Sequence, residues 1–220
     1  SSDGLASGNT FAEAILHGVL ERIERDAVVL WDISTLKQRM DACIDPASFH
    51  DPVLNELTAR IDSAGLTLRL FDITSDISIP AVTALLGPSD IAAARRVRYL
   101  DVTVGGGAHP SPLRAVIRAV TEAAQSRLTF ISGGRDDIEP ETFTRELPDS
   151  IRSCFDAAPK PASRLDAPLQ KGAEALLKLT IDHMRHAGIA SALALHLAHT
   201  SLTFSVAQIA LPELENPPGK

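Results

Sequence analysis

Residues 107–128 read GAHPSPLRAVIRAVTEAAQSRL, and this stretch decides how the rest of the chain is interpreted. Pro110 and Pro112 flank the start of a helix, because proline is tolerated in the first helical turn and disfavoured further in. Apolar residues then recur at helical spacing. The pattern predicts a long helix over about 111–130.

Four polar residues of this helix fall on one face: Arg114, Arg118, Glu122 and Gln125, at positions i, i+4, i+8 and i+11. Most of the other residues are apolar or alanine, so little of the helix can face water. Polar groups on a largely buried helix need partners. Two interpretations stay open: the face lines a polar cavity, or it is a single exposed stripe.

An earlier helix, expected over about 10–26, carries the second polar face. His17, Glu21 and Glu24 are four and three residues apart, so they lie on one side. Two carboxylates one turn apart can offer oxygen ligands to a hard cation such as Mg²⁺. The alternative is a solvated face on which Glu21 pairs with Arg25, four residues later.

The remaining pattern mixes strands and helices without strict alternation. It favours an α+β fold, with a mixed or antiparallel sheet packed against long helices, over a doubly wound sheet. The length of 220 residues suits one domain, or at most two small ones, and we expect residues 1–220 to be a portion of a single domain. No internal repeat is visible. Expected strands are 27–31, 67–73, 80–86, 98–104 (ended by the glycines at 105–107), 191–197 and 203–211; expected helices are 51–65 and 170–186, with a loop over 133–168 that holds one short helix near 140–147.

Composition excludes several classes of protein. The chain has 220 residues, 45% of them hydrophobic, which is ordinary for a globular domain. A net charge of −7 and 4% aromatic residues argue against nucleic-acid binding. No apolar run is long enough to span a membrane. Residues 1–9 do not resemble a signal peptide, and neither Cys43 nor Cys154 belongs to a CxxC pair, so a reducing, cytoplasmic location is expected.

A glycine-rich stretch over 132–137, SGGRDD, follows the second long helix. Glycines let backbone N–H groups approach an anion, and Arg135 suits a phosphate group. The glycines at 105–107 before His109 are a weaker case of the same kind. The alternative for both is a turn that needs no ligand.

Two histidine pairs have the HxxH spacing that zinc or nickel sites use. No cysteine or carboxylate is placed to complete either site, so a histidine-bound metal is a distant alternative. The pairs are His183 with His186 and His196 with His199.

Several segments together resemble the YcaO family, whose members use ATP to modify peptide backbone amides. They occur in the family's order and span almost the whole chain. The stretches over 107–128 and 134–138 are similar to the subtype linked to the partner protein TfuA. The other segments are GLASGNT (4–10), LERIERDA (20–27), FDITSD (71–76) and the closing stretch 206–214.

The resemblance implies roles for particular residues. In the family, the glutamates of an ExxER and an ExxQ motif hold Mg²⁺ around the phosphates of ATP. Carried over by position, the metal ligands are Glu21, Glu24 and Glu122, and the residues expected to contact the nucleotide are Arg25, Gln125 and Arg135. Many members have a serine where this chain has His17, and no residue is assigned to the catalytic step itself.

The implied activity is ATP-dependent phosphorylation of a peptide backbone amide. The product is an azoline, by cyclodehydration, or a thioamide, which the TfuA-like features favour in the biosynthesis of ribosomally made peptides. Expected partners are a peptide or protein substrate and a TfuA-like protein, with a homo-oligomer left open. Family members are longer at the N-terminus, so this chain alone is expected to bind ATP weakly or not at all. The alternative is a non-catalytic module that binds a peptide or partner.

Overall fold

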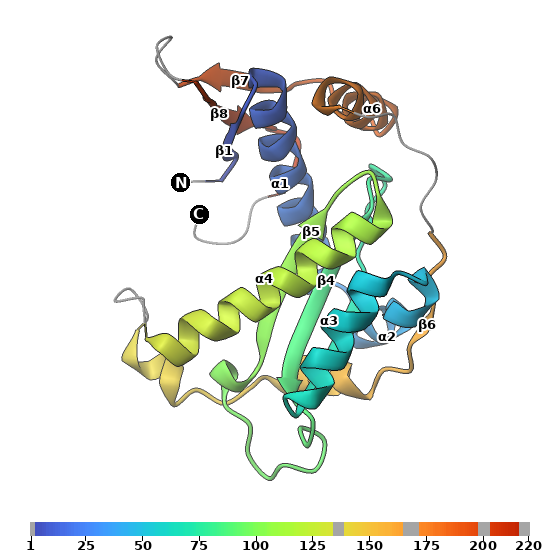
Figure 1. Cartoon of the computed structure of the whole chain (residues 1–220), viewed down its shortest axis with the longest axis vertical. Coiled ribbons are helices and arrows are strands. Elements are labelled where there is room, and N and C mark those ends of the chain that lie inside the picture. Colours follow the sequence, from blue (N-terminus) through green and yellow to red (C-terminus); the bar gives the residue numbers. More distant parts are fainter. Residues whose placement is uncertain (1–2, 134–138, 165–171, 198–202, 216–220) are drawn as a thin grey trace.

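The computed structural model describes residues 3–133, 139–164, 172–197 and 203–215 (Figure 1). The strands are β1 (Leu5–Gly8), β2 (Cys43–Asp45), β3 (Leu66–Asp72), β4 (Ala81–Pro88), β5 (Thr103–Ala108), β6 (Lys160–Pro161), β7 (Leu193–His196) and β8 (Ser205–Ala210). The α-helices are α1 (Phe11–Asp32), α2 (Leu36–Asp41), α3 (Pro52–Ser63), α4 (Pro112–Ser132), α5 (Asp149–Arg152) and α6 (Ala173–His186).

The strands form two sheets. One has five strands in the order β5-β4-β3-β2-β6, and the other has three in the order β1-β8-β7. All pairings are antiparallel except that of β2 with β6, which is parallel. Helices pack on both sheets (Figure 1). The predicted α+β fold with a mixed sheet and long helices is therefore confirmed.

Thr10 caps the N-terminus of helix α1, and its side chain accepts a hydrogen bond from the backbone N–H of Glu13. The predicted strand over 27–31 is wrong, because the helix continues through it. Ala27 and Trp31 are buried and extend the apolar stripe of the helix at a spacing of four residues. Their burial against the five-stranded sheet keeps the segment helical.

Helix α1 contributes to two separate hydrophobic clusters. Its first half packs on β8 and α6, and its last turns pack on one face of the five-stranded sheet (Figure 1). In the first cluster, Leu20 and Ile23 meet Met184 and Ile209. A single helix thus connects the two sheets.

Helices α3 and α4 cover the opposite face of the five-stranded sheet, and Figure 1 shows α4 lying along β5. The expectation that the glycines would end a strand is wrong, because β5 runs through them to Ala108. A Cβ added at Gly105 would lie 2.2 Å from the Ala119 carbonyl oxygen, and one at Gly107 would lie 2.1 Å from that of Ala115. The glycines are needed so that α4 can pack closely on the strand.

Most other predicted elements are found within a few residues of their expected places. The strand expected over 98–104 starts later, at Thr103, and a 3₁₀ turn over Tyr99–Asp101 precedes it. The short helix expected near 140–147 is a 3₁₀ turn over Pro140–Phe143. Across the described ranges, no helix combines the length and hydropathy that a membrane span requires.

Candidate functional site

Two of the predicted metal-ligating glutamates meet at the edge of β5. Glu122 Oε2 accepts a hydrogen bond of 2.9 Å from the backbone N–H of Gly106. Glu24 Oε2 accepts one of 3.2 Å from the backbone N–H of Ala108. Among the strands that the structure describes, β5 is the last of its sheet, so these amides have no neighbouring strand there to bond. The two carboxylates satisfy them instead.

Gly106 allows this approach. A Cβ added at this position would lie 2.7 Å from Glu24 Oε1, which is closer than real contacts allow. Gly106 therefore faces α1, while its neighbours Gly105 and Gly107 face α4. The glycines at 105–107 were considered as an anion-binding turn, but in the structure they bring two helices close to one strand.

Glu24 has an unusual electrostatic environment. Burial and, second, the charge of Glu122 raise its pKa to about 7, although the positive charge of Arg118 acts in the opposite direction. A carboxyl group with so high a pKa is half-protonated near neutral pH. Perturbed groups of this kind gather at functional sites, because a bound cation or substrate compensates their repulsion.

Glu21, the third predicted ligand, has other partners. Its Oε1 accepts hydrogen bonds from Arg25 at 3.0 and 3.1 Å, and its Oε2 accepts one of 3.3 Å from Gly4 N–H. Arg25 also pairs with Asp3 at 3.0 Å. Within the described ranges, no three His, Cys, Asp or Glu side chains are gathered closely enough to hold a metal ion. The structure thus brings two of the three glutamates together.

A surface cavity of about 410 Å³ opens beside Glu122 and Gly106, and we call it the carboxylate cavity. Arg118, Glu122 and Gln125 are exposed along α4 and contribute to its lining. The polar face of α4 is thus both exposed and part of a hollow, so both interpretations of it hold in part. Its lining residues are Gly106, Arg118, Thr121, Glu122, Gln125, Ser126 and Thr129.

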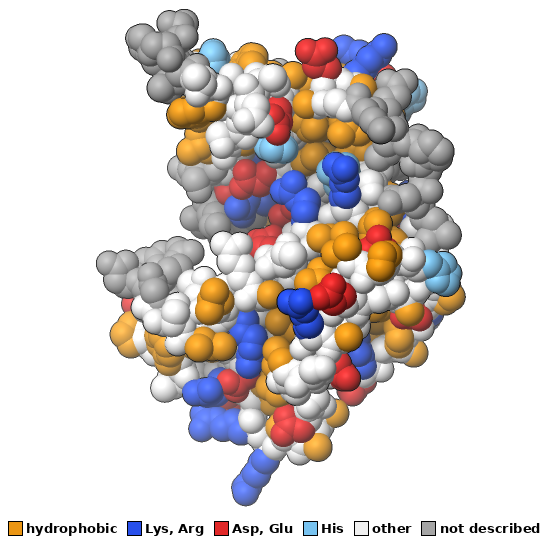
Figure 2. Space-filling view, in the orientation of Figure 1, with side chains coloured by type: hydrophobic (Ala, Val, Ile, Leu, Met, Phe, Trp, Pro, Cys, Tyr) orange, Lys and Arg blue, Asp and Glu red, His pale blue; other side chains and the backbone are white. Residues whose placement is uncertain are grey.

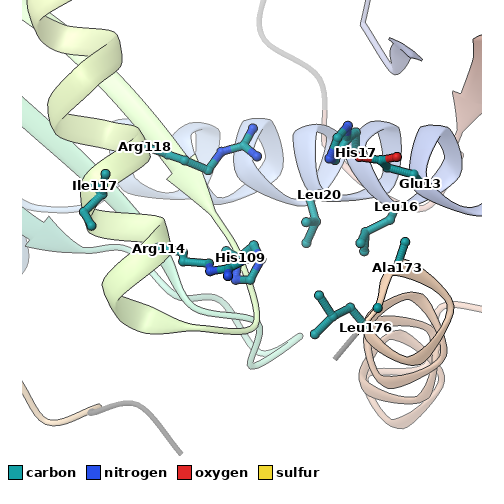
Figure 3. A pocket seen from close by; sticks show the side chains of 11 residues that line it. Glu13, Leu16, His17, Leu20, His109, Arg114, Ile117, Arg118, Ala173 and Leu176 are labelled. Carbon is teal, nitrogen blue, oxygen red and sulfur yellow. The ribbon is translucent and has the colours of Figure 1, made fainter. Parts of the chain in front are cut away.

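A second cavity of about 410 Å³ lies between α1, α4 and the start of α6, and we call it the three-helix cavity (Figure 3). Arg118 lines both cavities. Leu16, Leu20 and Leu176 form part of its apolar wall. Figure 2 shows acidic, basic and histidine side chains gathered in the same region, between the upper part of the molecule and the diagonal of α4.

Two histidines line the three-helix cavity. His109 is only 7% exposed, and its Nδ1 accepts a hydrogen bond of 2.8 Å from the backbone N–H of Ser111. His17 Nδ1 donates to the Ser7 carbonyl oxygen at 3.1 Å. His109 was not among the site residues predicted from the sequence. Its place between a glycine run and the start of α4 was the available signal.

The histidines of the two HxxH pairs that the structure describes do not line either cavity. Arg135 and His199 lie outside the described residues. His183 contacts the Ile77 carbonyl oxygen, and His196 packs on the ring of Phe11. No metal-binding group involves the histidines that the structure describes.

Comparison with known proteins gives one family. A family model described as YcaO cyclodehydratase, ATP- and Mg²⁺-binding, matches residues 1–215. An uncharacterized protein in the tfuA 3′ region of Rhizobium leguminosarum bv. trifolii is 39% identical over 220 residues, which cover 98% of this chain and 52% of that protein. An uncharacterized protein of Methanothermobacter thermautotrophicus is 37% identical over 145 residues, covering 66% of this chain and 36% of its own length. The chain spans about half of the first relative and less of the second.

Solved structures share the fold. The heterocyclase TruD matches with a TM-score of 0.72 and 24% identity, over 98% of this chain and 29% of that one. The YcaO protein of Methanopyrus kandleri, bound with AMPPCP and Mg²⁺, matches with a TM-score of 0.69 and 20% identity. That match covers 100% of this chain and 59% of the archaeal chain. At these identities, the likeness establishes the arrangement of helices and strands.

Proposed function

The chain belongs to the YcaO family, and from that premise we propose that it carries the ATP- and Mg²⁺-binding part of an enzyme that activates peptide backbone amides. The observation that carries the proposal is the Glu24–Glu122 pair at the edge of β5. The family is described as ATP- and Mg²⁺-binding, which agrees with the cofactors expected from the sequence.

The residues present fit a magnesium ion bound to phosphates. Carboxylate oxygens are the ligands that Mg²⁺ prefers. The half-buried Glu24, with its raised pKa, lies where a cation would relieve the repulsion from Glu122. Glu21 is the third proposed ligand, and it would reach the ion by exchanging its contact with Arg25 or Gly4.

Gln125 and the arginines would contact the nucleotide. Gln125 follows Glu122 by three residues on the same face of α4, and both line the carboxylate cavity. Arg25 is one turn from Glu21 on α1 and carries a charge suited to phosphate. We include Arg135 in the proposed nucleotide contacts because it lies in the glycine-rich stretch over 132–137, where an arginine suits a phosphate group.

ATP bound there would transfer its terminal phosphoryl group to a peptide amide oxygen, leaving ADP, so that this oxygen could depart as phosphate. The protein's contribution would be electrostatic. The glutamates would hold the Mg²⁺ that binds the phosphates, and the positively charged arginines would help to orient the phosphates. Attack by a Ser, Thr or Cys side chain on the amide carbon, with release of phosphate and of the amide and side-chain protons, would give an azoline. Attack by an external sulfide with release of phosphate would give a thioamide. The relative from the tfuA region supports a TfuA-like partner. We favour the thioamide product on the basis of the TfuA-like features of the sequence.

Binding of AMPPCP with Mg²⁺, measured by calorimetry on the full-length protein, tests the proposal. We expect Glu24→Gln and Glu122→Gln each to weaken AMPPCP binding at least tenfold, because each removes a metal ligand. Glu56→Gln is the matched control, since Glu56 is exposed on α3 and pairs only with Arg60 among the contacts described. Unchanged affinity in both site variants would favour the alternative, a module that binds a peptide or partner without catalysis.

A further inference from the structure

The free edge of β5 continues past the two glutamates. The backbone N–H groups of Gly106 and Ala108 face this edge, since they donate to side chains and not to β4. Residues two apart in a strand present their backbone groups to the same side, so the N–H and C=O of Val104 face the edge as well. Among the residues that the structure describes, none hydrogen-bonds to the Val104 groups on this side. The Val104 side chain is 46% exposed, so this part of the edge is open.

Another cavity, of about 440 Å³, lies at this open part of the edge, and we call it the edge cavity. Val104 lines it together with Trp31, in the last turn of α1, and Phe130, in the last turn of α4. Most of the lining is aliphatic or aromatic, and Asp32 is the one charged residue among the lining residues that the structure describes. A ligand in the edge cavity would therefore meet apolar surface and one negative charge.

The edge cavity adjoins the carboxylate cavity, because Ser126 lines both. Val104 and Gly106 are about 7 Å apart along the strand. An extended chain that pairs with Val104 would thus run toward Gly106, where pairing stops because Glu122 already accepts the Gly106 N–H. An open donor and acceptor on a strand edge suit an extended backbone better than a compact small molecule.

We propose that the edge cavity binds the peptide substrate in extended form, as a strand added to β5, with an apolar side chain in the cavity and a basic side chain near Asp32. The Val104 N–H and C=O would each bond to the peptide backbone. Asp32, Glu24 and Glu122 all lie along this edge, so their charge favours a neutral or basic segment. Pairing would hold a backbone amide of the peptide beside the carboxylate cavity. That the bound peptide is a substrate rests on the proposed function.

Hydrogen exchange of the full-length protein, read by mass spectrometry, tests the pairing without nucleotide. The probe is a hexapeptide of alternating valine and threonine with a lysine at each end, at millimolar concentration. We expect it to slow amide exchange in the segment that contains Val104. The same peptide with N-methylated backbone amides should have no effect, because it cannot donate to the Val104 carbonyl oxygen. Equal effects of the two peptides, or no effect of either, overturn the pairing.

Variants test whether the probe binds at the edge cavity, with affinity measured by fluorescence anisotropy of the labelled hexapeptide. Val104→Pro removes the edge N–H and should weaken binding about tenfold, since proline is tolerated where that group makes no ladder bond. Phe130→Ala removes part of the cavity wall and should weaken binding at least about threefold. Leu128→Ala is the matched control, because Leu128 is 65% exposed on the same helix and does not line the cavity. Unchanged affinity in Val104→Pro or in Phe130→Ala overturns the proposed contact. If Val104→Pro does not fold, the comparison of the two peptides decides the backbone contact.

Replacing both lysines of the probe by glutamate tests the charge, and equal affinity of the two peptides overturns the preference for a basic segment. AMPPCP with Mg²⁺ should bind together with the probe, because the two use neighbouring cavities. Displacement of the probe by AMPPCP would assign the edge cavity to the nucleotide and overturn the inference. A dimer that Val104→Pro dissociates, seen by light scattering, would show that a second copy covers the edge, and it would overturn the inference too. A protein that binds the probe at Val104 but binds no AMPPCP overturns the proposed function and supports the edge pairing.

Discussion

Glu24 and Glu122 approach one strand from helices that pack on opposite faces of its sheet, and their carboxylates accept hydrogen bonds from Ala108 and Gly106, two residues apart. Neither helix alone presents the pair. The site therefore exists only when α1 and α4 are both docked on the five-stranded sheet, so its electrostatics are tied to the stability of the fold.

The first prediction concerns pH. The pKa of Glu24 is about 7 in the folded protein and near its ordinary value of 4.5 when unfolded. The folded state then keeps a proton that the unfolded chain releases, so the free energy of unfolding falls as pH rises from about 4.5 to 7. This contribution is at most about 3 kcal/mol. Glu24→Gln should remove it, which makes the variant more stable than the parent at pH 8 without metal.

Melting temperatures of both proteins at pH 5 and pH 8 measure this effect. Mg²⁺ favours the ionised carboxylate, so it should raise the melting temperature of the parent more at pH 8 than at pH 5. Glu24→Gln should lose most of that increase. The same dependence on pH and Mg²⁺ in parent and variant would contradict the assignment of Glu24.

The second prediction compares two adjacent glycines of β5. Gly107→Ala places a Cβ 2.1 Å from the Ala115 carbonyl oxygen, which is backbone and cannot move aside alone. Gly106→Ala meets the end of the flexible Glu24 side chain at 2.7 Å. We expect a loss of about 3 kcal/mol for the first change and about 1 kcal/mol for the second. Denaturant unfolding measures both, and a larger loss at Gly106 would mean that α4 is not tightly packed on β5.

A third prediction separates metal binding from nucleotide binding at Arg25. Its guanidinium neutralises Glu21, so Arg25→Gln should free that carboxylate and increase the affinity for Mg²⁺ alone about threefold. The same variant should weaken AMPPCP binding, because a phosphate contact is lost. Magnesium-dependent melting and calorimetry would show changes in opposite directions. Changes in the same direction would argue that Arg25 only supports the structure.

The fourth prediction concerns a buried clamp away from the cavities. Asp26 Oδ1 accepts a hydrogen bond of 2.8 Å from Glu215 N–H, and Arg22 donates one of 3.3 Å to the carbonyl oxygen of the same residue. Asp26→Ala leaves the Glu215 amide without this acceptor and should cost about 2 kcal/mol of unfolding free energy. Asp26→Asn should cost less, because an oxygen remains.

Asp41→Ala serves as the comparison for the clamp, since Asp41 is exposed and pairs with Lys160 on the surface. Its expected cost is below about 0.5 kcal/mol. Chemical denaturation of the three variants gives the order, and an Asp26→Ala variant as stable as Asp41→Ala would show that the clamp contributes little.

Much of the fold could be predicted from apolar periodicity. The wrong predictions concern segments whose secondary structure is determined by packing against other elements. Residues 27–31 form a short apolar run that suits a strand or a buried helix equally, and contact of Trp31 with the sheet selects the helix. The glycines at 105–107 suggest the end of a strand, because the sequence shows only that their backbone is conformationally free. It does not show that a helix packs closely against them.

The candidate site could be predicted only in part. Helical spacing and the family resemblance together indicated that Glu24 and Glu122 belong to one site, and the structure places both at the β5 edge. The Glu21–Arg25 pair was one of two open interpretations and is present. Arg118 lines two cavities because of the way α1, α4 and α6 converge. The spacing of residues along one helix gives no information about that arrangement.

The connection of two sheets by α1 has a mechanical consequence. Glu24 lies thirteen residues after Phe11, which is about 20 Å along the helix axis. A tilt of about 5° pivoting at the three-stranded sheet would move Glu24 by nearly 2 Å, enough to break its hydrogen bond to Ala108. Because α1 packs on both sheets, a shift of one sheet relative to the other would change the spacing between the two carboxylates.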